Sequence, residues 1–225
     1  MKHFQDEEHD YESSKLNIFS NSYGLLFATL GVLIQVFAFM YTDATWLSLI
    51  SGVTGIIAVV LCAERKMSFW IFAWIQLITY VILAIDQQLW GEVGENIFYA
   101  ITMIAGMFIW NKNKEGDQVK AKQLIKNKFE LIKISCASGI IGLWYVLKQT
   151  NDTQPFMDSI TTIPAIIAQI FMIMAYREQW YFWLIIDVAS IYMWAITGNW
   201  CMAAQFVFWT VNCLYGLKNW KNEIS

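Results

Sequence analysis

Charged residues and prolines are scarce in this chain of 225 residues. Only 15 % of the residues are Asp, Glu, Lys or Arg, and proline occurs twice. Soluble domains contain about 25 % charged and about 45–50 % apolar residues, whereas 57 % of this chain is apolar. The composition therefore excludes an ordinary soluble domain and indicates an integral membrane protein.

The sequence also lacks the usual marks of an enzyme or a metal site. It has no glycine-rich phosphate loop, no zinc-ligand spacing and no Ser/His/Asp set. Both histidines lie in a polar N-terminal head, and the four cysteines lie in or beside apolar segments without a C-x-x-C pair, which is typical of small packing residues. We therefore expect no enzymatic activity, no cofactor and no bound metal.

Eight apolar stretches are present, and most approach the ~17–25 residues that a membrane-spanning helix needs. They cover roughly residues 23–41, 45–63, 68–85, 96–110, 134–147, 160–176, 180–196 and 201–217. The sequence thus predicts an all-α, multi-pass membrane protein.

The positions of Lys and Arg predict its orientation. Nearly all of them lie on the side shared by the two termini and by the loops after stretches two, four and six, and only Lys148 lies on the other side. Because short cytoplasmic loops retain Lys and Arg, both termini are predicted to be cytoplasmic. The Lys-rich loop at 111–133 is expected to contact anionic lipid, and nucleic acid is not implied.

An internal repeat runs through the chain at an offset of 110 positions. It places Trp70, Trp90, Gly106 and Trp110 on Trp180, Trp200, Gly216 and Trp220 without a gap. Four spans of displacement give the halves the same orientation, as in transporters built from parallel repeats around a central site. The predicted parts are a polar cytoplasmic tail (1–22), an extra N-terminal transmembrane helix (23–41), a three-helix repeat (45–110), the basic loop (111–133), a linker helix (134–148), a second three-helix repeat (160–217) and a cytoplasmic tail (218–225).

Asp187 is the most informative candidate for a binding residue. Spacings of three and four residues place Trp180, Trp183 and Asp187 on one helical face. A carboxylate inside a span costs about 2.5–3.5 kcal/mol, so it should face a polar cavity or a partner. Aromatic faces beside a carboxylate suit a flat or cationic ring. A Trp at the membrane interface and a neutral, helix-bridging Asp are the alternative interpretations.

Other polar or aromatic residues within or beside the spans are further candidates for substrate contacts. They are Gln76, Glu95, Phe98, Tyr99, Gln169 and Asn212. Each is able to bond a ligand or a neighbouring helix. Gly106 and Gly216 are expected to allow close approach of helices.

These features resemble the PnuC-type vitamin transporters, bacterial membrane proteins that import nicotinamide riboside and related compounds. The resemblance runs from about Trp46 onward and depends most on the W-x-x-W-x-x-x-[ND] run that ends at Asp187 and on the Phe98-Tyr99 pair with Gly106 downstream. It implies two three-helix bundles joined by one linking helix, in a plan similar to the SWEET sugar transporters, and a homotrimer in the plasma (inner) membrane. It also implies facilitated diffusion, with the vitamin trapped by a cytoplasmic kinase.

Two positions depart from the family pattern. Nicotinamide riboside transporters usually carry Asn at the position of Asp187 and Met at the position of Thr102. An ionised Asp187 would favour the pyridinium of nicotinamide riboside or the thiazolium of thiamine, and a protonated one could bond a neutral nucleoside. Import of nicotinamide riboside is the leading expectation, with deoxynucleoside and thiamine as alternatives. A membrane scaffold that uses the repeat only for assembly is the alternative of another class.

Overall fold

A computed structural model describes Phe19 and residues 22–41, 45–86, 90–149, 155–196 and 200–224. Its elements are α2 (Ser22–Tyr41), α3 (Trp46–Ala63), α4 (Phe69–Asp86), α5 (Trp90–Lys112), β1 (Lys114–Glu115), β2 (Gln118–Val119), α6 (Lys126–Leu147), α7 (Pro155–Ile173), α8 (Gln179–Ile196) and α9 (Trp200–Ile224). The fold is all-helical apart from the short β1–β2 hairpin. The predicted N-terminal tail, except Phe19 and Ser22, lies outside the described residues.

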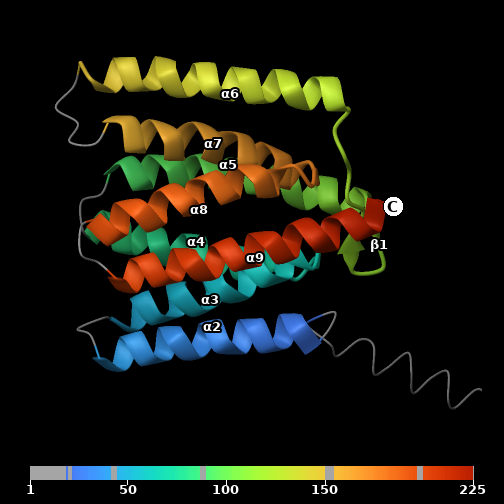
Figure 1. Ribbon diagram of the computed structural model, residues 1–225. Coiled ribbons are helices and arrows are strands. Elements are labelled where there is room, and N and C mark those ends of the chain that lie inside the picture. The colour runs from blue at the N-terminus through green and yellow to red at the C-terminus, as the bar shows by residue number, and fades with distance from the viewer. Residues whose placement is uncertain are drawn as a thin grey trace, which may run out of the picture.

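The helices run side by side in one bundle (Figure 1). At one edge α2 packs against α3, and at the opposite edge α6 packs against α7. Between these edges α3 contacts α4 and α9, α7 contacts α5 and α8, α4 contacts α5, and α8 contacts α9. The hairpin and the end of α9 lie together at one end of the bundle, which we call the hairpin end.

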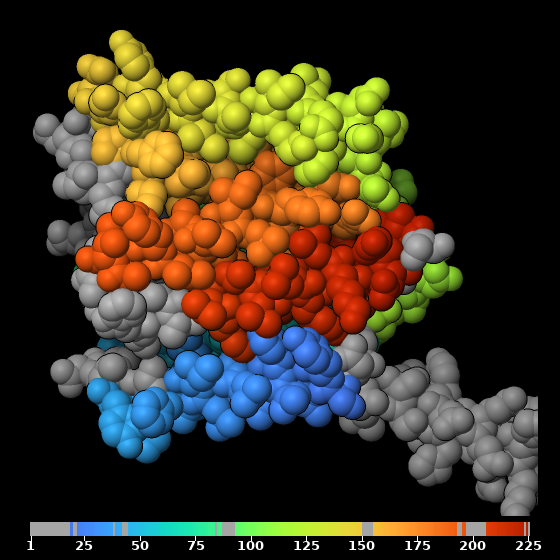
Figure 2. Space-filling view, viewed as in Figure 1, coloured from blue at the N-terminus to red at the C-terminus, as the bar shows by residue number. Residues whose placement is uncertain are grey.

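Several helices are suited to a membrane. Among the described residues, α2, α3, Val93–Lys112 of α5, α6 and α7 are each long and apolar enough to cross a bilayer, and Phe69–Leu83 of α4 is a shorter apolar helix. The outer helices α2 and α6 flank α8 and α9 on the face seen in Figure 2. They expose large apolar side chains, such as Phe37 of α2 and Ile141 of α6, which lipid or another protein would have to cover.

Local sequence explains where the helices begin and end. Thr45 caps α3, because its Oγ1 accepts a hydrogen bond of 3.2 Å from the Ser48 amide. Helix α6 begins at Lys126, inside the range predicted to be a loop, and α9 continues to Ile224 through the predicted tail. Lys and Glu have high helix propensity, so these helices extend beyond their apolar stretches.

The segment 113–124, here called the strap, joins the turns that follow α3 and α7. Arg65 and Ala175 occupy these turns in the left-handed region, with φ of 61° and 60°. The Val119 amide donates to the Arg65 carbonyl oxygen at 2.9 Å, and the Lys122 amide donates to the Ala175 carbonyl oxygen at 2.8 Å. The strap therefore fixes both turns at the hairpin end.

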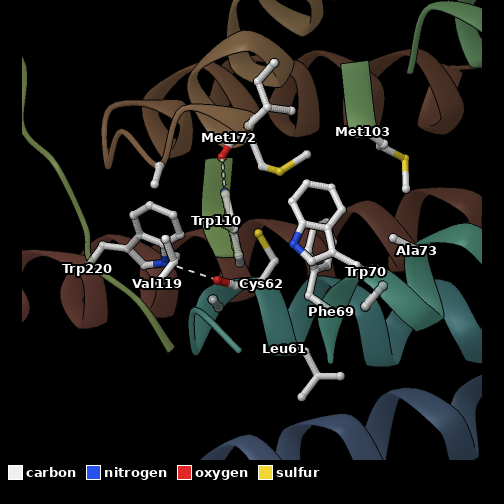
Figure 3. Close-up of a cluster of buried hydrophobic side chains, with 14 of the residues drawn as sticks. Leu61, Cys62, Phe69, Trp70, Ala73, Met103, Trp110, Val119, Met172 and Trp220 are labelled. Atoms are coloured by element: carbon white, nitrogen blue, oxygen red, sulfur yellow. Dashed lines mark hydrogen bonds between the residues drawn. The ribbon is translucent and has the colours of Figure 1, made fainter. Parts of the chain in front are cut away.

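A cluster of tryptophans forms much of the buried core (Figure 3). Trp110 Nε1 donates to the Met172 carbonyl oxygen at 2.9 Å, and Trp220 Nε1 donates to the Cys62 carbonyl oxygen at 3.1 Å. Trp220 lies 110 positions after Trp110, and Met172 lies 110 positions after Cys62, so the two bonds are equivalent in the repeat. Each therefore ties one half of the chain to the other.

Both glycines of the repeat lie against a tryptophan. A Cβ added at Gly106 would lie 2.4 Å from Trp70 Cη2, and one added at Gly216 would lie 2.5 Å from Trp180 Cε2. No real Cβ comes so close, so only glycine leaves room for the indole at either position. The expected close approach of helices at these glycines is confirmed.

Candidate substrate site

Asp187 lies in the middle of α8 and is 3 % exposed. Its Oδ2 accepts a hydrogen bond of 3.2 Å from the Cys213 thiol of α9. Among the described residues, Oδ1 has no hydrogen-bond partner. A carboxyl group is thus buried between two helices with one oxygen held and the other available.

The two tryptophans before Asp187 differ in their surroundings. Trp180 is 3 % exposed, packs on Gly216 and meets Trp220 edge to face, with ring centroids 6.0 Å apart. Trp183 is half-buried and packs against both buried clusters of the molecule. Trp183 therefore has the more accessible ring surface, whereas Trp180 is occupied by core packing.

Gln169 connects the two halves through a polar contact. Its Nε2 donates to Thr102 Oγ1 at 3.0 Å, which joins α7 to α5. Thr102 Oγ1 also lies 2.9 Å from the Phe98 carbonyl oxygen and 3.0 Å from that of Tyr99. The Gln169 side chain is thereby tied to the turn of α5 that contains Phe98 and Tyr99.

Asn212 makes the equivalent contact in the other half. Its Nδ2 donates to the Val59 carbonyl oxygen at 3.1 Å, which joins α9 to α3, and its Oδ1 is buried without a partner. Residues 212 and 59 lie 110 positions from Thr102 and Gln169, so the two bonds occupy equivalent places. Both are polar links between the halves.

The remaining candidates lie on the first half. Tyr99 Oη donates to Glu95 Oε1, and the rings of Phe98 and Tyr99 have centroids 6.0 Å apart. Tyr99 and Trp183 pack against the same buried cluster. Gln76 of α4 is half-buried and lies against Gly55 of α3. Within the described part of the chain, no contact joins Glu95, Phe98 or Gln76 to Asp187, so their roles stay predictions.

Cations are far from this site. Helices α3, α4, α7 and α8 contain no Lys or Arg, and in α5 and α9 these residues occur only toward the hairpin end, at Lys112, Lys218 and Lys221. The Cys213 thiol is the described polar group that contacts Asp187, and Trp183 lies one helical turn before it in α8. Such surroundings suit a neutral or cationic ring and offer no Lys or Arg from these four helices to a phosphate.

Cys213 was not among the predicted site residues, because buried cysteines are usually packing residues. A signal for its position exists in the repeat. Cys213 precedes Gly216 by three residues and thus shares its helical face, which is the face packed on Trp180 of α8.

A helical bundle with several helices long and apolar enough to cross a bilayer is the architecture of a multi-pass membrane protein. The family described as Nicotinamide mononucleotide transporter matches residues 45–222, and the chain belongs to this family. It is therefore a transporter and not an enzyme, as the sequence predicted.

Three known proteins show how extensive the similarity is. The nicotinamide riboside transporter PnuC of Haemophilus influenzae is 30 % identical over 206 residues, which cover 89 % of this chain and 90 % of that protein. The protein of the same name from Neisseria mucosa is 28 % identical, with 85 % and 78 % covered. A crystal structure of the vitamin B3 transporter PnuC matches with a TM-score of 0.76 and 26 % identity, covering 91 % of this chain and 92 % of that one.

Proposed function

We propose that this protein carries nicotinamide riboside across the bacterial plasma membrane. The relatives that match most of the chain have this compound in their names. The observation that carries the proposal is Asp187, a buried carboxyl with one available oxygen, which lies one helical turn after Trp183 in α8. A pyridinium ring stacked on Trp183 would bring its cationic ring or its carboxamide to this carboxyl.

The geometry favours the riboside over the mononucleotide in the family's description. The two compounds differ by a phosphate, which binds best to Arg, Lys or clustered backbone amides. No Lys or Arg of the described helices lies near Asp187, and a second negative charge would be repelled by an ionised carboxylate. We expect the mononucleotide to bind at least about tenfold more weakly, or about 1.4 kcal/mol.

Calorimetric titration of the detergent-purified protein tests this function. Nicotinamide riboside, nicotinamide mononucleotide, thiamine and thymidine would be titrated into the wild type and into Trp183→Ala. Binding of the riboside that is lost in Trp183→Ala supports the proposal. Tighter binding of thiamine or thymidine would reassign the substrate, and no binding by any compound would favour the scaffold role.

We propose facilitated diffusion as the transport mode, driven by phosphorylation of the vitamin inside the cell. Rocking of the two halves about the site would alternate its access. In proteoliposomes the internal riboside should rise only to the external concentration. Enclosing a riboside kinase and ATP should permit further uptake, whereas accumulation without the kinase would contradict this mode.

The proposed architecture is two three-helix bundles, α3–α5 and α7–α9, with α6 as the linker and α2 as the extra helix, making eight spans. It is supported by the contacts that recur 110 positions apart and by the outer positions of α2 and α6. The hairpin end would be cytoplasmic, because Lys112, Lys120, Lys126 and Lys218 lie there. Labelling of single cysteines from either side of the membrane tests this orientation.

We further propose a homotrimer with one pathway in each protomer. The apolar surfaces on the outer helices are consistent with contacts between copies or with lipid. Light scattering of the purified protein, corrected for detergent, would give the number of chains. A monomer under conditions that preserve binding would contradict the trimer.

A further inference from the structure

Cys213 has a partner that its counterpart in the other half lacks. The residues 110 positions before Asp187 and Cys213 are Leu77 and Met103, both buried in the apolar core. At this place the first half is thus filled by two apolar side chains. The tryptophan and glycine contacts that recur in both halves therefore do not require a carboxyl and a thiol at these positions. Their pairing in the second half calls for another explanation.

The thiol holds one particular oxygen of Asp187. Cys213 Sγ lies 3.2 Å from Oδ2, and both side chains are almost fully buried. A thiol has one hydrogen to donate, so this bond leaves Oδ1 unpaired. A ligand donor could therefore bond to Oδ1 without displacing a described protein group.

We infer that Cys213 is a positioning residue of the substrate site: its thiol fixes Asp187 through Oδ2, so that Oδ1 accepts a hydrogen bond from an N–H group of the ligand. This inference rests on the transport function proposed above. It specifies the ligand class, a flat ring that carries an N–H donor. A ring that presents a carboxylate at the same place would be rejected, because two acceptors would face each other.

The carboxamide of nicotinamide riboside is such a donor, whereas nicotinic acid riboside has a carboxylate in its place. A site that bonds an N–H group discriminates strongly against an analogue that lacks it, because the buried partner is left unpaired. We therefore expect nicotinic acid riboside to bind at least about 100-fold more weakly than the amide. Equal binding of the two compounds would overturn the assignment of Oδ1 as the acceptor.

Substitution of Cys213 separates positioning from packing. Cys213→Ala removes the donor and should weaken binding of nicotinamide riboside about tenfold in calorimetry. Cys213→Ser retains an O–H donor in a smaller side chain and should bind within about twofold of the wild type. If Cys213 only filled space, the polar serine would restore nothing, so equal losses in the two variants would overturn the inference.

A matched control is Cys136→Ala. Cys136 is a free, buried cysteine of α6 in the other apolar cluster. This variant should bind as the wild type does. Melting temperature and gel filtration would identify any variant that fails to fold.

Infrared spectroscopy tests the contact without a ligand. The S–H stretching band of Cys213, isolated by subtracting the spectrum of Cys213→Ala, should lie at lower frequency than that of Cys136. Asp187→Leu should move the Cys213 band back toward a free thiol, and an unmoved band would overturn the contact. If the wild type binds the riboside and Cys213→Ala binds it equally well, the positioning role is refuted and the proposed function stands. No binding by the wild type would refute the proposed function, and this inference would fall with it.

Discussion

The two proposed repeats, α3 to α5 and α7 to α9, share a set of packing contacts, here called the frame, but differ in the chemistry of other buried positions. The Met172 carbonyl oxygen accepts hydrogen bonds from the Trp110 indole and the Ala175 amide. The equivalent Cys62 carbonyl oxygen accepts hydrogen bonds from the Trp220 indole and the Arg65 amide. This frame therefore uses the same bonds twice. The two halves differ in other side chains that pack between these contacts. Ala73 and Leu77 in the first half correspond to Trp183 and Asp187 in the second.

This difference separates residues that stabilise the fold from residues that make a site. At the position equivalent to Asp187, the first half carries Leu77, a buried apolar side chain. A buried carboxyl is costly in a membrane-spanning helix, and such residues mark sites of function. We therefore expect the repeated contacts to be needed for stability and the positions that differ to place the main substrate contacts in the second half.

The largest expected effect comes from making the second half resemble the first. Asp187→Leu should weaken binding of nicotinamide riboside about 10- to 100-fold, because a hydrogen bond to a charged group contributes about 1.5–3 kcal/mol. The same variant should melt at the same or a higher temperature than the wild type, since the cost of a buried carboxyl is removed. Calorimetry and thermal unfolding in detergent measure the two effects.

Leu77→Met is the matched control, because it changes the equivalent position without changing its apolar character. It should alter neither binding nor melting by more than the scatter of the measurements. If Asp187→Leu bound the riboside as tightly as the wild type, the division between frame and site would be wrong.

Breaking the frame should lower stability next. An alanine at Gly106 or Gly216 would force its Cβ into Trp70 or Trp180, and overpacking of this kind typically costs about 1–3 kcal/mol. We expect both variants to melt several degrees lower. Gly142→Ala of α6 is the control, because nothing lies within 4 Å of the added Cβ. A loss in only one of the two frame variants would show that the halves are not equivalent.

The paired tryptophan bonds should contribute equally. Trp110→Phe and Trp220→Phe each remove one N–H donor while the acceptor carbonyl keeps its backbone partner, so each should cost about 1 kcal/mol plus the loss of ring packing. The two indoles meet edge to face with centroids 6.0 Å apart. The double variant should therefore depart from additivity by about 0.5–1.5 kcal/mol, which thermal unfolding of the single and double variants would reveal.

The sequence was sufficient to predict the frame. The tryptophans and glycines recur at one offset, and a glycine within an apolar helix indicates close packing, which the contact of Trp180 with Gly216 confirms. The all-helical fold with several apolar spans and the transporter family were also predicted correctly. The helical membrane fold follows from composition and spacing, and the family follows from the resemblance of the motifs that end at Asp187 and begin at Phe98.

The partners of the site residues were not predictable in the same way. Asn212 bonds the carbonyl group of Val59, and a backbone acceptor leaves no mark in the sequence. The Gln169 to Thr102 contact depends on the packing of α7 against α5, which are separated by α6 along the chain. Cys213 resembles a packing residue in the sequence, and the positioning role inferred for it depends on its hydrogen bond to Asp187, which only the structure reveals.

The smallest expected effect concerns Glu178, which stands where the first half has Ser68. Burial raises the pKa of the Glu178 carboxyl above its usual value, although the backbone amides of Glu178 and Leu124 and the charge of Arg177 act in the opposite direction. The folded protein thus holds this proton more tightly than the unfolded chain does. Stability should therefore fall as the pH rises from the unfolded pKa of about 4.5 through the folded pKa.

Glu178→Gln removes the titrating group, so its melting temperature should depend less on pH over this interval. Between about pH 4.5 and pH 7, the change in melting temperature of the wild type and of Glu178→Gln should differ by only a few degrees. Thermal unfolding in detergent measures both changes. Ser68→Ala, at the equivalent turn of the first half, should leave the pH dependence of the wild type intact. An unchanged pH profile in Glu178→Gln would mean that Glu178 is hydrated in the folded protein and that burial does not raise its pKa.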